Sequence, residues 1–385
     1  METKKLYLEN PYLTRFTAKV LSCESAKDGF DVVLDQTAFY PEGGGQPADQ
    51  GFLAAETPVF VIDVHEKGGV ILHRCTAALE VGADVNGQLD WGRRFDHMQQ
   101  HSGEHIFSGI LHSLTGFENV GFHMGSDCIT VDFSGVVTDE VAQQVETLAN
   151  HYIYSDAPID IQVLNHEQLK LLTYRSKKEI PGDVRIVSFP GADCCACCGT
   201  HVQSAGQVGL IKVLSNQKFR EGSRIEIISG KRALDHLSEL YRQNTAVSQL
   251  LSAKPGETAA AVERMKNELA AEKLRAAALE EQLIGFRAAA YENAGDVLLM
   301  ESEMSSDSLR RLAVAIGECC GGRCAVFAGS EGNYKYAVRL AAGADERAFA
   351  KELNAALHGR GGGRDGFIQG SAAATEAEIR AFFGA

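Results

Sequence analysis

The sequence predicts an α+β protein with a small N-terminal β-barrel at residues 1–90, an α+β domain at 91–232, a helical coiled-coil hairpin at 233–294 and a C-terminal α/β domain at 295–385. Three observations support this division. The first part consists of short, alternating or β-branched runs separated by turn residues. A helical period then starts at Arg93 and is followed by mixed strands and helices. Finally, the composition changes to the Ala, Glu, Leu, Lys and Arg that are typical of long helices.

The barrel is predicted from segments with the pattern of strands, namely FTAKVLSCE, FDVVLDQ, VFVIDVHEK and GVILHRC. Because they are short and bounded by Gly, Asp and Lys turns, a small closed barrel is the expected package. Between them lies VLDQTAFYPEGGGQPADQG, residues 33–51. Its consecutive glycines, Gly43, Gly44 and Gly45, either form a bare turn or let the backbone approach a ligand closely.

The α+β domain begins with RRFDHMQQHSGEHIFSGILHSL, where Met98, Ile106, Ile110 and Leu111 recur at helical spacing. The strand DCITVDFSG, the helix TDEVAQQVETLANHYIYSD, the strand IDIQVLN and further short strands up to RIEIISG follow. Such a mixture is typical of an α+β domain.

The hairpin is predicted from two helical segments separated by KPGE at residues 254–257. Apolar residues recur at spacings of three and four after this break, which favours an antiparallel coiled-coil hairpin turned by Pro255-Gly256. Two amphipathic helices packed on a globular body are the alternative. Because an apolar seam of this kind often pairs with a second chain, we expect a homodimer formed through the hairpin and the C-terminal domain.

The C-terminal α/β domain contains a glycine-rich segment, GRGGGRDGFIQGSA, at residues 359–372. We expect a loop there. It lacks the Lys-Ser/Thr ending and the strand-to-helix context of a phosphate-binding P-loop, so an ATP-binding motif is not expected. Arg360 and Arg364 either contact an RNA backbone or belong to a loop that only packs.

Composition limits the classes of function. With 385 residues and a formal net charge of −14, the chain can form several cores, and promiscuous binding to nucleic acid is disfavoured. The N-terminal METKKLYLEN lacks the apolar stretch of a secretory signal, and no run reaches membrane-spanning length. We therefore expect a cytoplasmic protein with no membrane partner, whose 10 cysteines are thiols or metal ligands rather than disulfides.

Two motifs have the spacing of metal ligands. His97, His101 and His105 recur every four residues on the predicted helix, so that two imidazoles can meet one ion. In DCCACCGTHV, Cys197 and His201 supply a thiolate and an imidazole from one turn. Two histidines with Cys-His suit tetrahedral zinc. The spacing leaves a CxxC knuckle open as well, with Cys194 and Cys197 or with Cys195 and Cys198. We expect His97 to be exposed, and the alternative is that it supports the metal ligands without binding the ion.

These motifs resemble the alanyl-tRNA synthetase editing domain and the free-standing AlaX editing proteins, which carry HxxxH and CxxxH motifs. The matching segments are HSGEH at 101–105, CCGTHV at 197–202, the glycine segment at 33–51, FHMGSDCITVDF at 122–133 and GSRIEIISGKRAL at 222–234. The helical hairpin and a C-terminal domain with a glycine-rich segment resemble the DHHA1-type end of alanyl-tRNA synthetases. The chain therefore resembles the long form of AlaX, without the domain that activates amino acids.

The resemblance implies a deacylase that cleaves the ester joining a wrong amino acid, serine or also glycine, to alanine-specific tRNA. It implies one zinc ion per chain, which either activates water or anchors the substrate. The implied residues are His101, His105, Cys197 and His201 for zinc; Thr37 for the serine hydroxyl; Gly43, Gly44, Gly45 and Gln46 for the substrate; His123 for positioning water; and Lys218, Arg224, Arg360 and Arg364 for tRNA. An editing site that hydrogen-bonds the hydroxyl of serine can spare alanine.

Two other classes of function remain open at this point. The chain is alternatively a non-catalytic, zinc-containing module that binds tRNA or associates with a synthetase. A zinc hydrolase acting on a small ester or phosphoester ranks last, because the C-terminal domain lacks the Asp-His-His cluster of a two-metal phosphoesterase. Release of an amino acid from mischarged tRNA separates an editing enzyme from a binding module.

Overall fold

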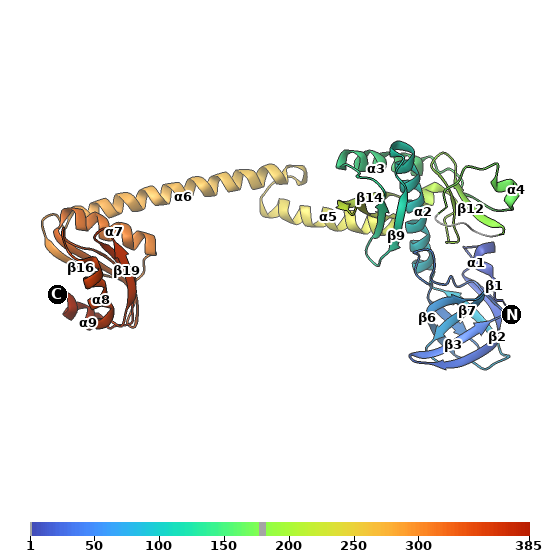
Figure 1. Cartoon of the computed structure of the whole chain (residues 1–385), viewed down its shortest axis with the longest axis horizontal. Helices are drawn as coiled ribbons and strands as arrows, with labels where there is room; N and C mark the ends of the chain where they lie inside the picture. The colour runs from blue at the N-terminus through green and yellow to red at the C-terminus, as the bar shows by residue number, and fades with distance from the viewer. Residues whose placement is uncertain (1, 177–181) are drawn as a thin grey trace. The chain divides into compact units, whose positions relative to one another are not determined.

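The computed structural model describes residues 2–176 and 182–385 (Figure 1). The chain divides into two compact units, Met1–Thr245 and Ala246–Ala385, which are described separately below. Among the described residues, no helix combines the length and apolar character needed to cross a membrane.

The first unit opens with a closed six-stranded barrel, drawn in blue in Figure 1, whose strand order is β2-β3-β7-β6-β5-β8. Its strands are β2 (Arg15–Ala26), β3 (Gly29–Leu34), β5 (Gly51–Ala54), β6 (Pro58–Lys67), β7 (Val70–Cys75) and β8 (Asp84–Leu89). Burial alternates along β2 and β8, because successive side chains point to opposite faces of a strand. The small N-terminal barrel and the α+β class are thus confirmed. A short α1 (Leu6–Glu9) and the parallel pair β1 (Lys4–Lys5) and β4 (Gln36–Thr37) lie beside it.

A long helix, α2 (Trp91–Thr115), follows the barrel. The Asp90 side chain caps it by accepting a hydrogen bond from the amide of Arg93, and Gly116 ends it with a φ of 73°. Arg94 fixes the helix to the barrel: its guanidinium is fully buried, pairs with Asp49 and donates to the carbonyl of Ala38. The middle of α2 is enclosed on all sides, and this burial sets the environment of its histidines.

Two sheets, the helices α3 and α4 and the short η1 follow α2 in this unit. The order of the larger sheet is β14-β15-β10-β9 and that of the smaller is β11-β12-β13. The elements are β9 (Asn119–Met124), β10 (Ile129–Phe133), α3 (Asp139–Tyr154), β11 (Asp160–Leu164), α4 (His166–Leu169), β12 (Val184–Phe189), β13 (Asp193–Ala196), η1 (Ala205–Val208), β14 (Ile211–Phe219) and β15 (Gly222–Ser229). Their core gathers around α2 through Met98, Ile106, Phe107 and Leu111.

The predicted helices after residue 230 are α5 (Gly230–Leu250) and α6 (Thr258–Ala289), with the short η2 (Pro255–Glu257) between them. The seam side chains of α6 are largely exposed, including Val262, Met265, Leu269, Leu279, Leu283 and Phe286. Their antiparallel coiled-coil pairing, and a homodimer formed through them, stay predictions.

The second unit contains a five-stranded sheet of order β16-β17-β18-β20-β19. Its elements after α6 are β16 (Gly295–Glu301), α7 (Ser306–Cys319), β17 (Gly321–Ser330), β18 (Asn333–Arg339), α8 (Glu346–Ala356), β19 (Arg360–Arg364), β20 (Phe367–Ala372) and α9 (Glu376–Phe383). Only β16 and β17 are parallel, whereas the other pairs are antiparallel.

The expectation of a glycine-rich loop at residues 359–372 is wrong, because this segment forms the β19–β20 hairpin. Asp365 and Gly366, with φ of 57° and 69°, form its turn. The glycines serve close packing: a Cβ on Gly361 would lie 2.1 Å from the hydroxyl of Tyr336. Arg360 and Arg364 are exposed at the two ends of the edge strand.

Candidate metal centre

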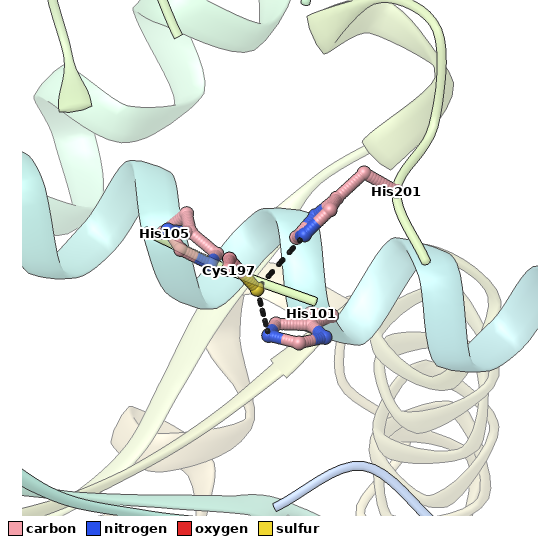
Figure 2. A group of neighbouring side chains, drawn as sticks. All are labelled: His101, His105, Cys197 and His201. Carbon is pink, nitrogen blue, oxygen red and sulfur yellow. Dashed lines mark hydrogen bonds between the residues drawn. The ribbon is translucent and has the colours of Figure 1, made fainter. Parts of the chain in front are cut away.

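Four side chains from two distant segments converge at one point of the first unit. His101 and His105 come from the buried middle of α2, and Cys197 and His201 come from the turn after β13. Their ligand atoms all lie within 4.8 Å of one another. Figure 2 shows the sulfur of Cys197 between the rings of His101 and His201, 3.5 Å from one Nε2 and 3.3 Å from the other. This is the predicted set of four.

Hydrogen bonds orient all three imidazoles. Each ring uses Nδ1 for a contact with a buried neighbour, which leaves Nε2 directed toward the other ligands. The contacts are His101 Nδ1 with Gln46 Oε1 at 2.9 Å, His105 Nδ1 with Asp193 Oδ2 at 2.8 Å, and His201 Nδ1 with Ser102 Oγ at 3.2 Å. Holding the second nitrogen in this way is characteristic of metal-binding histidines.

The residues fit a tetrahedral metal site. Nitrogen and sulfur ligands around zinc lie about 3.3 to 3.8 Å apart, which matches the separations from the sulfur of Cys197. Burial raises the pKa of the Cys197 thiol, but the neighbouring His101 and His201 outweigh it and hold that pKa well below its ordinary value. A thiolate, the form that binds metals, is therefore favoured.

Asp193 links the centre to Arg175. The Arg175 guanidinium donates to both carboxylate oxygens, at 2.7 Å each, and the same carboxylate accepts from His105. Burial raises the pKa of Asp193, yet its bonds to His105 and Arg175 lower it overall. Burial lowers the pKa of His105, but its interactions with Asp193 and Cys197 raise that pKa overall. Sequence reasoning missed Asp193, although it directly precedes the cysteines of DCCACC.

Gln46, a predicted substrate contact, lies between the barrel and the two segments that carry the converging ligands. It is fully buried, its Oε1 contacts His101 and accepts from the amide of Thr200, and its Nε2 donates to the Thr200 hydroxyl at 2.8 Å. The Gln46 side chain therefore ties the barrel to both metal-binding segments.

The three glycines before Gln46 form a tight turn. Gly43 and Gln46 exchange backbone hydrogen bonds of 3.1 and 3.0 Å, and Gly44 and Gly45 have φ of 59° and 86°. A Cβ on Gly45 would lie 2.5 Å from the ring of Phe122, so the turn packs directly on β9. Of the three, Gly44 lines the cavity described next.

A cavity of about 350 Å³ opens beside the ligands. The described residues that line it are Gly44, His101, Glu104, His105, Asn119, Phe122, Arg175, Ser176, Cys195, Ala196, Cys197, Cys198 and Gly199. Sequence reasoning missed Glu104 and Asn119, which are both buried in its wall. The helical spacing of Glu104 from His101, inside HSGEH, was a signal for the first of them.

Two further predicted site residues are not among those that line the cavity, namely Thr37, predicted to bind the serine hydroxyl, and His123, predicted to position water. Thr37 is fully buried among barrel residues, and its hydroxyl contacts His73 Nε2 at 2.8 Å and accepts from the amide of Phe39. It is not among the described residues that line the cavity, and its reading of the serine hydroxyl stays a prediction. His123 is exposed, because alternation along β9 turns Phe122 toward His101 and His123 to the opposite face.

His97 and the three cysteines next to Cys197 lie in different surroundings. His97 was expected to be exposed but is buried, because α2 is enclosed on all sides, and it is not among the four converging ligands. Cys195 forms a second potential ligand group with His105 and Asp193. Cys198 lies at the cavity wall, whereas Cys194 packs against a separate small core.

The predicted tRNA contacts lie outside this cavity. Arg224 is bonded to Asp132 at 2.7 and 2.8 Å, and its guanidinium lies 3.7 Å from the ring centroid of Phe219. Lys218 is exposed on β14. Contact of these two residues, and of Arg360 and Arg364, with RNA stays a prediction.

Comparison with known proteins relates the barrel and the Cys197 segment to tRNA synthetases. Residues 9–93 match the family of tRNA synthetases class II (A), and residues 184–226 match the threonyl and alanyl tRNA synthetase second additional domain. The second match includes two of the four converging ligands, and the first includes the turn that contacts them.

Similarity to individual proteins identifies the family more narrowly. The alanyl-tRNA editing protein AlaX-L of Pyrococcus horikoshii is 33% identical over 306 residues, covering 77% of this chain and 74% of the relative. Aarsd1-A of Xenopus laevis, another alanyl-tRNA editing protein, is 32% identical over 277 residues, covering 68% of this chain and 66% of the relative. The alanine–tRNA ligase of Pyrococcus abyssi is 31% identical and covers 96% of this chain, which spans 42% of the ligase. The chain belongs to the family of AlaX-type alanyl-tRNA editing proteins, which confirms the resemblance.

Proposed function

We propose that this protein edits in trans: it hydrolyses the ester of alanine-specific tRNA that carries serine, and also glycine, at a centre that binds one zinc ion. The observation that carries the proposal is that three of the four ligands form part of the cavity wall. His101, His105 and Cys197 line the cavity, so a substrate seated there meets the metal site directly. Relatives named as alanyl-tRNA editing proteins support the substrate class.

The chain's own residues supply binding and orientation. Gln46, Ser102 and Asp193 hold the imidazoles, and Phe122 stacks on His101 with ring centroids 5.2 Å apart. Zinc bound by the four ligands would either polarise the ester carbonyl or anchor the terminal ribose and amino group. Because four protein ligands complete a tetrahedral site, either role would need a fifth coordination position or the exchange of one ligand for a substrate atom.

We also propose where and with what the protein acts. Mischarged alanine-specific tRNA is its partner, and the proposed phosphate contacts are Lys218, Arg224, Arg360 and Arg364. The net charge of −14 makes such binding sensitive to salt. A cytoplasmic location and a homodimer through the hairpin and C-terminal domain belong to the same proposal.

Deacylation assays test the function. Zinc-loaded protein is incubated with alanine-specific tRNA that carries labelled serine, glycine or alanine, and the released amino acid is measured. We expect release of serine and glycine while alanine stays attached. Protein that binds these tRNAs and releases nothing over hours would instead be the non-catalytic binding module.

A further inference from the structure

The buried face of α2 that carries two metal ligands also carries a carboxylate. His101, Glu104, His105 and Ser108 follow one another at spacings of three, one and three residues, and so form one stripe of the helix. Glu104 is 4% exposed and lines the same cavity as both histidines. It is the only carboxylate among the described residues that line this cavity.

One oxygen of Glu104 is fully used and the other is not. Its Oε1 accepts from the hydroxyl of Ser108 and from Nδ2 of Asn119, at 2.5 Å each. No described residue donates a hydrogen bond to Oε2, and none forms an ion pair with this carboxylate. The charges of Arg175 and His105 act on this carboxylate through space. Because none of the described residues donates to Oε2, that oxygen is still an acceptor for a ligand in the cavity.

Asn119 adds a second acceptor. Its Nδ2 must face Glu104, because an amide oxygen placed 2.5 Å from a carboxylate oxygen would be repelled. Its Oδ1 therefore points elsewhere, and it is a buried atom with no hydrogen-bond partner. Asn119 is 8% exposed and also lines the cavity. The pair thus offers the cavity two acceptor oxygens and no donor.

Among the described residues of the cavity wall, Arg175 directs its hydrogen bonds to Asp193 rather than to Glu104. The two bonds are 2.7 Å long. The ligand that fits the two acceptor oxygens, Oε2 of Glu104 and Oδ1 of Asn119, is a small cation with several N–H donors. An aminoacyl ester carries one, the α-ammonium group, on the carbon next to the carbonyl that is hydrolysed.

We propose that Glu104 and Asn119 bind the α-ammonium group of the aminoacyl ester, through Oε2 and Oδ1 respectively. This assignment rests on the proposed function. It makes Glu104 a specificity-determining residue: the site takes esters of free α-amino acids and disfavours acyl groups whose amine is blocked or replaced. Serine, glycine and alanine all carry the ammonium group, so this contact does not select among them.

Binding of stable analogues tests the assignment independently of hydrolysis. Seryl-3′-amino-3′-deoxyadenosine has an amide in place of the ester, and its counterpart has a hydroxyl in place of the α-amine. By calorimetry, zinc-loaded wild-type protein is expected to bind the amine about 10- to 100-fold more tightly than the hydroxyl analogue. Equal affinities would overturn the assignment, whether or not any variant folds.

Glu104→Gln removes the charge and keeps the shape. The variant is expected to lose most of the preference for the amine, to bind the hydroxyl analogue as the wild type does, and to retain its zinc. Glu118→Gln is the matched control, because Glu118 is an exposed carboxylate just before Asn119 that does not line the cavity. Equal losses for both analogues in Glu104→Gln would mean that Glu104 acts on the centre itself, as a base or a structural group.

Deacylation separates this result from a failure of the proposed function. If wild-type protein releases serine from tRNA and the preference for the amine is absent, only the assignment of Glu104 fails. If wild-type protein releases no amino acid but prefers the amine analogue, the ammonium site stands while the hydrolase proposal fails. The two claims therefore fail independently.

Discussion

Replacing Gln46 by methionine removes the side-chain contacts between the barrel and the metal centre without changing the volume much. Three hydrogen bonds disappear: one to Nδ1 of His101, one to the amide of Thr200 and one to its hydroxyl. The partners are buried, His101 being 3% and Thr200 1% exposed, so water does not replace the lost bonds. At about 1 kcal/mol for each bond, the free energy of unfolding should fall by about 3 kcal/mol.

The same substitution releases the ring of His101, so zinc affinity should fall by about 10- to 100-fold. Competition with a chromophoric chelator measures this affinity, and urea unfolding of the zinc-loaded protein measures stability. Gln50→Met is the control, because Gln50 is exposed and donates one hydrogen bond, to the carbonyl of Ile62. Unchanged zinc affinity combined with weaker substrate binding would refute the structural role and restore Gln46 as a substrate contact.

Four further predictions follow from the centre, the barrel and the hairpin. Cys197→Ser combined with His201→Ala should abolish zinc binding by metal analysis, and full retention would assign the metal to the neighbouring cysteines. Asp193→Asn should lower zinc affinity about 10- to 100-fold in chelator competition, and no change would show that His105 needs no carboxylate partner. Burial lowers the pKa of His73 from 6.5 to about 4, so its contribution to stability is complete above pH 6.5 and is lost as the pH falls toward 4. His73→Gln should therefore flatten the pH dependence of the unfolding free energy in that range, by on the order of 3 kcal/mol; an unchanged slope would contradict this. Light scattering of intact protein at micromolar concentration should give the mass of a dimer, and a monomer would remove the proposed pairing.

The four converging side chains could be proposed as metal ligands from the sequence because their spacing is local. His101 and His105 lie one helical turn apart, and Cys197 and His201 share one turn of the chain, so each half is visible in a short window. The two halves lie 96 residues apart in the chain and meet only in the tertiary structure. The family resemblance indicated this meeting, whereas the spacing of the residues could not. The barrel was equally accessible, since alternation along its strands is a local pattern.

The sequence was least informative where side-chain direction or enclosure decides the surroundings of a residue. His123 and Phe122 are neighbours in the chain, and only the face that β9 presents to α2 determines which of them meets His101. Thr37 and Gln46 belong to one glycine segment, yet the first points into the barrel core and the second toward the metal centre. His97 shares the spacing of the metal ligands, but neighbouring elements bury it.

The glycine-rich segment shows that composition alone does not determine secondary structure. Glycines normally favour loops, but in β19 they permit a close approach of strand to strand, and Gly361 leaves room for the hydroxyl of Tyr336. Glu104 shows the converse case. Its position in HSGEH can be read from the sequence. Only the structure shows that Ser108 and Asn119 both donate to Oε1 of Glu104 and not to Oε2.

The central claim is that the cavity beside the four ligands hydrolyses a misplaced aminoacyl ester. The most direct measurement is a single-turnover time course of serine release from seryl-tRNA specific for alanine, with zinc-loaded protein in excess and alanyl-tRNA run in parallel. The account predicts rapid release of serine while alanyl-tRNA decays no faster than it does without protein. Seryl-tRNA that decays at its spontaneous rate in the presence of tightly bound protein would contradict it.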